Sequence, residues 1–293
     1  MNAPLRTAQH APAHWLAQLD ACFPQRLVPL ASGGQVAMRE CGRGSGRLPL
    51  VLLHGISSGA ASWLPAVMAL EQPQHVLAWD APGYGESTPL ADAAPTADAY
   101  APRVHEWLDA LQVGRCVLAG HSLGALMATA YARLHPQRVA RLVLVSPASG
   151  YGDRPADAER TRRQRLDALA ERGVEGLAER IDERLLSPAA DADARGWVRW
   201  NAARLHPAGY SQAVEVLCGS TLQATPAGLP VEVHCGAEDV VTPPAACEAA
   251  ARRLGATFHL IPGAGHASPV EQPVAVARLL AAAAQRTQEP QHA

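Results

Sequence analysis

Short apolar runs separated by helical patterns are the feature that most limits how this 293-residue chain can fold. The runs at 48–53 and 139–145 are almost continuously apolar, which is typical of strands buried on both faces. The stretches 98–111 and 123–134 between them have helical periodicity. Strands that alternate with helices form parallel sheets with right-handed crossovers. The pattern therefore predicts an α/β fold, with a mostly parallel central sheet flanked by helices.

The other expected elements follow the same alternation, apart from an N-terminal hairpin. Residues 26–31 and 35–41, split by Ser32-Gly33-Gly34, predict this hairpin. The further expected strands are 75–79, 115–119, 230–235 and 257–261, and the further expected helices are 244–254 and 270–284.

The alternation stops between residues 149 and 221, where no convincing strand appears. Leu177, Ile181 and Leu185 are spaced four residues apart, which places them on one helical face. We therefore expect a helical cap at 150–220, above the carboxyl ends of the strands. The expected units are an N-terminal extension with a short helix at 1–25, a core at 26–149 and 221–287, the cap at 150–220, and a tail at 288–293. The cap contains eleven arginines, most of which we expect on a solvated helix face.

Composition and charge narrow the range of functions. Hydrophobic residues make up 48% of the chain and the net charge is −2, so a substantial core is available and nothing favours nucleic acid or an anionic membrane. Six scattered cysteines without a C-x-x-C pair predict a reducing compartment and no structural zinc. No stretch resembles a secretory signal or reaches the length of a membrane span. We expect a cytoplasmic protein that binds neither nucleic acid nor membrane.

Ser122 lies between Gly120 and Gly124 in the sequence GHSLG, at an expected strand-to-helix junction. This is the G-x-S-x-G pattern of a nucleophile elbow, a tight turn that presents the serine hydroxyl above the sheet. The glycines remove side chains that would collide in the turn, and the following helix N-terminus favours developing negative charge. An ordinary loop serine is the alternative for the bare motif, but the flanking strand and helix favour the nucleophile.

A serine hydroxyl needs a general base that is itself oriented by an acid. The expected base is His266, in PGAGHASP after the last predicted strand, because the side chain of His121 diverges at the turn and His54 belongs to another loop. After the preceding strand, HCGAEDVVTPP offers Glu238 and Asp239 as the acid. We favour Asp239, which directly precedes an apolar pair and a turn.

Two backbone N–H groups are expected to bind the carbonyl oxygen as it becomes tetrahedral. Leu123, the residue after the nucleophile, supplies one of them. The loop LLHGISSGAASW supplies the other, from Ile56. In the cap, Trp197, Trp200 and Tyr210 are candidates to line an apolar acyl or aryl site, although packing is the commoner role of such side chains.

These motifs together resemble the α/β-hydrolase superfamily over nearly the whole chain. They are LLHG at 52–55, DAPGYGEST at 80–88, GHSLG at 120–124, GAEDVVTP at 236–243 and GAGH at 263–266. The chain order Ser122, Asp239, His266 is also the order described for that superfamily. The resemblance implies an α/β-hydrolase fold with a helical cap, in which Asp80 and Gly83 shape a loop and do no chemistry.

Branches of the superfamily can be weighed separately. HGISSGAASW resembles a stretch of the meta-cleavage-product hydrolases, which cleave C–C bonds in ring-opened aromatic compounds. Those enzymes usually carry tryptophan directly after the catalytic histidine, where this chain has Ala267. Epoxide hydrolases and haloalkane dehalogenases use aspartate at the position of Ser122 and are disfavoured. Cofactor-free haloperoxidase-like members, which share a Ser-Asp-His triad, stay open.

The sequence therefore predicts a lidded serine hydrolase that cleaves an ester or related acyl substrate. Ser122 would attack the carbonyl, His266 would move the proton, and Asp239 would orient the imidazole. The expected partners are a small-molecule acyl substrate and water, with no metal and no organic cofactor. Two alternatives remain: a C–C hydrolase of ring-fission products, and a catalytically inactive binding module of the same fold.

Overall fold

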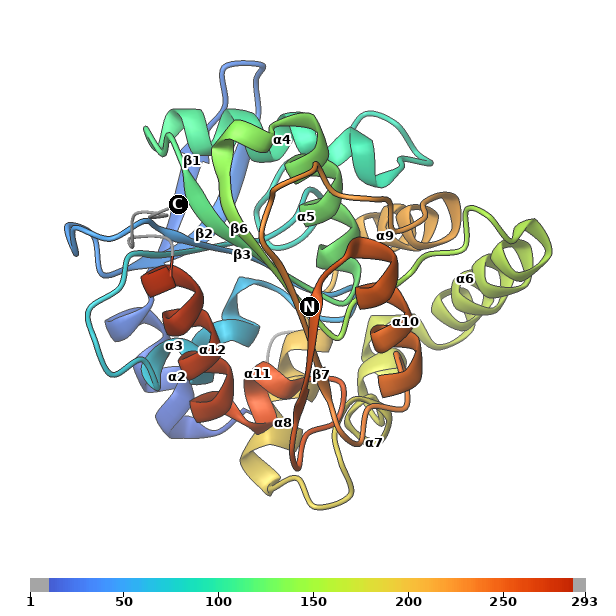
Figure 1. Cartoon of the computed structure of the whole chain (residues 1–293). Coiled ribbons are helices and arrows are strands. Elements are labelled where there is room, and N and C mark those ends of the chain that lie inside the picture. Colours follow the sequence, from blue (N-terminus) through green and yellow to red (C-terminus); the bar gives the residue numbers. More distant parts are fainter. Residues whose placement is uncertain (1–10, 287–293) are drawn as a thin grey trace.

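The computed structural model describes residues 11–286, with an eight-stranded sheet at its centre (Figure 1). The strands are β1 Gln25–Pro29, β2 Gln35–Cys41, β3 Leu50–Leu53, β4 Val76–Trp79, β5 Cys116–His121, β6 Val139–Val145, β7 Val231–Gly236 and β8 Thr257–Ile261. They lie in the order β1-β2-β4-β3-β5-β6-β7-β8. β1 and β2 form an antiparallel hairpin, β2 is antiparallel to β4, and the other neighbours are parallel. The predicted α/β fold is confirmed.

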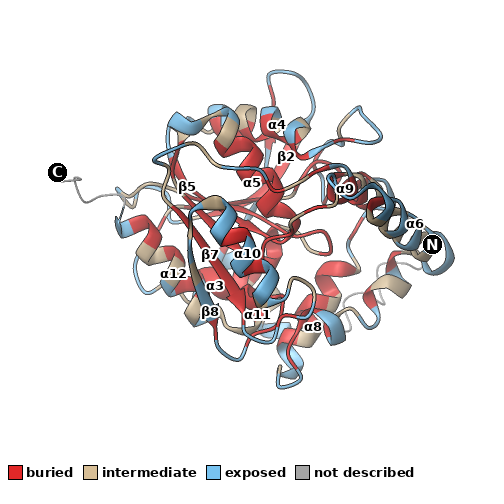
Figure 2. Cartoon of the chain, turned by 45° about the vertical axis from the view of Figure 1, so that its right-hand side comes forward, coloured by how far each residue is buried: buried red, intermediate tan, exposed pale blue. Residues whose placement is uncertain are grey.

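Helices bury both faces of this sheet, as Figure 2 shows by the red inner sides of the ribbons. One layer consists of α4 Ala97–Ala110, α5 Leu123–Leu134 and α10 Pro244–Leu254, and the other includes α2 Ala13–Cys22, α3 Leu64–Met68 and α12 Pro273–Arg286. Every residue of β3, β5 and β7 is buried. Burial from both sides explains why β3 and β5 lack a polar–apolar alternation, whereas β7 alternates and buries its polar residues as well.

Helices also form the connection from β6 to β7, which lies beside the sheet in Figure 1. They are α6 Pro155–Ala178, α7 Asp182–Leu185, α8 Ala192–Ala202 and α9 Pro207–Gly219. The connection leaves and rejoins the core at one point, because Gly150 pairs with Thr221 in an isolated β-bridge. A Cβ on Gly150 would lie 2.0 Å from the carbonyl oxygen of Ser220, so this closure requires glycine.

Two expectations about helices are wrong. The stretch expected as one helix at 270–284 forms α11 Ser268–Glu271 and then α12, because Pro273 can begin a helix but cannot continue one. The apolar spacing at 177–185 does not belong to one helix either. Helix α6 ends at Ala178 and α7 begins at Asp182. The three side chains nevertheless line the same cavity, on either side of this helix break.

The ends of the chain are described in part. The expected N-terminal extension contains α2, but residues 1–10 lie outside the described residues, as does the expected tail at 288–293. All six cysteines are free thiols, and four of them are buried. Within residues 11–286, no helix combines the length and apolar character that crossing a bilayer demands.

Candidate active site

Ser122 occupies a tight turn between β5 and α5. Its backbone has φ 53° and ψ −115°, a conformation that costs a non-glycine residue on the order of 1–3 kcal/mol. Three hydrogen bonds hold this conformation. The Ser122 N–H donates to the Val145 carbonyl at 3.0 Å, and its own carbonyl accepts from Ala125 and Ala148 at 3.0 and 3.1 Å. The surrounding backbone therefore fixes the position of the serine.

The glycines of the motif allow the close packing that the turn requires. A Cβ on Gly120 would lie 2.5 Å from the carbonyl oxygen of Gly124, and one on Gly124 would lie 2.3 Å from that of Leu53. Both obstacles are main-chain atoms, which cannot move aside as a flexible side chain can. The turn thus depends on both glycines, for the steric reason inferred from the sequence.

We expect Gly124→Ala to lower the free energy of unfolding by about 2 kcal/mol or more, because the added methyl group must displace the backbone after β3. Gly114→Ala is the matched control, since a Cβ there meets no atom within 4 Å. Urea unfolding of both variants measures the difference. Equal midpoints for the two would contradict the steric account.

His266 and Asp239 follow β8 and β7, and their side chains are in direct contact. His266 Nδ1 lies 2.9 Å from Asp239 Oδ2 and 3.2 Å from Thr242 Oγ1. A carboxylate only accepts hydrogen bonds, so Nδ1 carries the hydrogen and, in the neutral ring, Nε2 is left to accept a proton. Both side chains are buried. The arrangement orients the imidazole as a general base requires.

The Asp239 carboxylate accepts further hydrogen bonds. Oδ1 accepts from the N–H groups of Val241 and Thr242 at 2.8 and 2.9 Å, and Oδ2 accepts from Thr242 Oγ1 at 2.9 Å. Burial by itself raises the pKa of Asp239, but the hydrogen bond and charge of His266, together with the Thr242 N–H, outweigh burial and lower this pKa to about 2. Glu238 is exposed. Of the two acids offered by the sequence, only Asp239 contacts the histidine.

The two histidines set aside in the sequence analysis have structural contacts in the site. His121 Nε2 donates to the main-chain carbonyl of His266 at 2.9 Å, and burial followed by the charge of His266 lowers the pKa of His121 to about 3. His54 Nε2 accepts from the Ala81 N–H at 3.0 Å. His121 therefore ties the serine turn to the loop of His266. The sequence offers no signal for this contact, because it joins segments far apart in the chain.

The expected oxyanion donors lie on either side of Ser122. Leu123 is the first residue of α5, where the N–H has no partner within the helix. Among the described residues, the Ile56 N–H makes no hydrogen bond, while the Ile56 carbonyl accepts from Tyr84 Oη at 2.8 Å. Gly55, just before Ile56, is so close that a Cβ there would lie 3.1 Å from Ser122 Cβ. Both N–H groups are thus free to bind an oxygen beside the serine.

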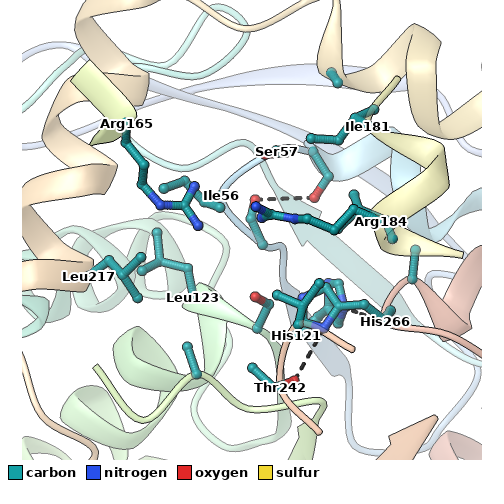
Figure 3. A pocket seen from close by; sticks show the side chains of 18 of the residues that line it. Ile56, Ser57, His121, Leu123, Arg165, Ile181, Arg184, Leu217, Thr242 and His266 are labelled. Atoms are coloured by element: carbon teal, nitrogen blue, oxygen red, sulfur yellow. Dashed lines mark hydrogen bonds between the residues drawn. The ribbon is translucent and has the colours of Figure 1, made fainter. Parts of the chain in front are cut away.

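A cavity of about 670 Å³ opens above these residues, a size suited to a small molecule (Figure 3). Ser122, His266, Ile56 and Leu123 line its floor, and the walls come from α6, α7, α8 and α9 together with the loops that follow β3, β6, β7 and β8. Tyr210 is one of the lining residues, as expected from the sequence.

Trp197 and Trp200 do not line the cavity, which corrects the expectation that they contact substrate. Their rings stack at 4.6 Å, and Trp197 Nε1 donates to the Ala61 carbonyl at 3.2 Å. The indoles are buried where α8 packs against the core. Packing is the role that these two tryptophans have in the fold.

Most of the eleven arginines between residues 150 and 220 are exposed, as expected from the sequence, but the sequence did not indicate that several of them border the cavity. Five of them line the cavity: Arg154, Arg165, Arg172, Arg180 and Arg184. No Asp or Glu lies among the described lining residues. Within residues 11–286, no group of three or more His, Cys, Asp or Glu side chains is placed to hold a metal ion.

Comparison with known proteins shows which family and which relatives this chain resembles. The model of the alpha/beta hydrolase family matches residues 50–279. The human 1-acylglycerol-3-phosphate O-acyltransferase ABHD5 is 36% identical over 121 residues, which cover 40% of this chain and 34% of that protein. The (E)-2-((N-methylformamido)methylene)succinate hydrolase of Acinetobacter baylyi is 35% identical over 121 residues, covering 41% and 44%. The chain thus matches less than half the length of these curated relatives.

Solved structures share the fold at low sequence identity. A thermophilic esterase from Thermogutta terrifontis superposes with a TM-score of 0.76 at 24% identity, covering 90% of this chain and 99% of that one. The enol-lactonase from Burkholderia xenovorans superposes with a TM-score of 0.74 at 20% identity, covering 88% and 99%.

Proposed function

This chain belongs to the alpha/beta hydrolase family, and from that premise we propose that it is a serine hydrolase cleaving an ester or related acyl substrate through an acyl-enzyme. One observation carries the proposal. The strained Ser122 lies on the floor of the cavity with His266, whose ring is oriented by the Asp239 carboxylate. Strained backbone that the surrounding structure holds in place is typical of functional sites.

The chemistry follows from the groups in place. Ser122 Oγ attacks the acyl carbon, and His266 Nε2 takes the hydroxyl proton. Asp239 stabilises the imidazolium, while the N–H groups of Ile56 and Leu123 bind the oxygen that becomes negative. His266 then gives the proton to the leaving alcohol, which departs. Water, deprotonated by the same nitrogen, attacks the acyl-enzyme, and collapse of the second tetrahedral intermediate releases the acid and restores Ser122.

We also propose that residues 150–220 act as a cap over a core formed by 26–149 and 221–287. The helices of this segment supply most of the cavity wall away from the serine, and the segment joins the core at the Gly150–Thr221 bridge. A cap in this place would choose substrates by shape and charge and would exclude water from the acyl-enzyme.

The test is to measure hydrolysis of p-nitrophenyl acetate, p-nitrophenyl octanoate and one ring-fission dienoate, and to locate the adduct formed by a fluorophosphonate. We expect turnover of at least one ester and a single adduct on Ser122, detected by mass spectrometry of the peptides. Ser57 and Ser149 also line the cavity, so an adduct on either would contradict the assignment. Fast dienoate cleavage with poor ester turnover would favour the C–C hydrolase. Failure of every substrate and of labelling would favour an inactive binding module.

A further inference from the structure

The charge that faces the cavity is all of one sign. Its five arginines are accompanied by no carboxylate among the described lining residues. Arg154 and Arg180 form ion pairs with neighbouring acidic residues. Arg165, Arg172 and Arg184 form no ion pair with any residue between 11 and 286; Arg165 is half-buried, and Arg172 and Arg184 are exposed. The cavity therefore holds cationic groups that the protein itself does not neutralise.

Arg165 of α6 and Arg184 of α7 are directed toward each other from opposite sides of the cavity (Figure 3). Within residues 11–286, the Arg165 side chain makes one hydrogen bond, from Nη1 to Tyr210 Oη at 3.3 Å. Surrounding protein atoms, and then the charge of Arg165, lower the pKa of the Arg184 guanidinium below its usual range. Guanidinium groups nevertheless stay protonated in proteins. The two positively charged guanidinium groups therefore repel each other within the cavity, and an anion bound between them would relieve this repulsion.

Helix α7, which carries Arg184, is joined to two other segments. The carbonyl of Leu185 accepts from the Ala267 N–H at 2.7 Å, which joins α7 to the loop of His266. The buried Asp182 carboxylate binds Arg199 and so joins α7 to α8. A guanidinium that projects from an anchored backbone loses less conformational freedom when it binds a ligand.

We propose that Arg165 and Arg184 form an anion subsite, so that the preferred substrate is an ester carrying a carboxylate or phosphate group away from the bond that is cleaved. This inference rests on the proposed function of Ser122. Arginine suits both groups because its planar N–H donors match two oxygens at once. Neutral esters of equal length would enter the same cavity but leave the two cations without a partner.

The test compares kcat/KM for two esters of equal chain length, mono-p-nitrophenyl glutarate and p-nitrophenyl pentanoate. We expect a preference of at least about tenfold for the charged ester, the size typical of a charged hydrogen bond. Arg165→Gln and Arg184→Gln should each abolish most of this preference by raising KM for the glutarate ester. The loss of kcat/KM should be at least about fivefold larger for the glutarate ester than for the pentanoate ester, because only the glutarate ester carries a carboxylate for these arginines. Arg163→Gln is the matched control, because Arg163 lies on α6, is paired with Glu159 and does not line the cavity.

Equal kcat/KM for the two esters, or a preference that survives both substitutions, would overturn the anion subsite while leaving the serine mechanism standing. If neither ester is hydrolysed, the proposed function fails. The anion subsite is then tested separately, by measuring the binding of anions that cannot react. For that purpose, calorimetry measures monomethyl glutarate and glycerol 3-phosphate with Ser122→Ala protein and with the same protein carrying Arg184→Gln. Tighter binding of one ligand, weakened by the second substitution, supports the subsite and distinguishes carboxylate from phosphate. Absence of binding by both overturns it.

Discussion

Ser122→Ala is expected to lower kcat for ester hydrolysis by about four to six orders of magnitude, because the variant has no atom to form the acyl-enzyme. The residual rate would come from the Ile56 and Leu123 N–H groups and from binding. Steady-state and single-turnover assays with p-nitrophenyl acetate measure the loss, and circular dichroism checks the fold. Ser211→Ala is the control, since Ser211 lies on α9 outside the cavity lining. Activity near that of the unmodified protein in Ser122→Ala would contradict the nucleophile assignment.

Two substitutions of Ser122 distinguish the loss of catalysis from the release of backbone strain. Ser122→Gly should lose as much activity as Ser122→Ala. The glycine variant should, however, be more stable than the alanine variant by about 1 kcal/mol, because only glycine adopts φ 53° without a steric cost. Urea unfolding of the two inactive proteins measures this difference directly. A glycine variant no more stable than the alanine variant would show that the turn stores no strain.

Asp239→Asn is expected to lower kcat by about four orders of magnitude at neutral pH with little change in KM. The neutral amide can donate a hydrogen bond to His266, which favours the ring form with the hydrogen on Nε2 and leaves that nitrogen unable to accept the serine proton. Glu238→Gln is the matched control, since Glu238 is the adjacent acid but is exposed. Similar losses in both variants would contradict the assignment of Asp239.

The Asp239 carboxylate also contributes to the stability of the folded protein, and this contribution depends on pH. Its folded pKa of about 2 lies below the ordinary value of 3.8, so the carboxylate stabilises the fold fully above pH 3.8. This stability is lost as the pH falls from 3.8 toward 2, because the proton binds the unfolded chain more tightly. Melting temperatures across this range should therefore fall more steeply for the unmodified protein than for Asp239→Asn. Parallel curves would contradict the pKa shift.

The fold and the relative positions of the serine, aspartate and histidine could be predicted from sequence because the strands dictate both. The central strands β3 to β6 are apolar runs that alternate with helical patterns, and the carboxyl ends of parallel strands meet at one edge of the sheet. The residues that follow β5, β7 and β8 must then gather above that edge. This geometry brings the loops after β7 and β8 together, and the shape of the first loop decides that Asp239, and not Glu238, contacts His266.

The helices between β6 and β7 were predicted less well, because no sheet sets their direction. The Leu177–Leu185 spacing looks like one helical face, yet the chain breaks between α6 and α7 and both pieces face the cavity. Arginines on a helix suggest bulk solvent, and sequence does not distinguish bulk solvent from a water-accessible cavity. Trp197 and Trp200 were expected in the cavity but pack in the core. Sequence does not distinguish these two places, because an aromatic side chain fits a binding site and a packed core equally well.

The hydrogen bond from His121 to the carbonyl of His266 joins residues 145 positions apart in the chain, and this separation bears on how the protein folds. Contacts between distant segments form late, since the intervening chain must first be ordered. Synthesis from the N-terminus produces the serine turn while the aspartate and histidine segments are still unmade. A nascent chain therefore contains Ser122 before Asp239 and His266 exist, and if the proposed function holds, recovery of activity during refolding should report docking of β7 and β8 onto the sheet.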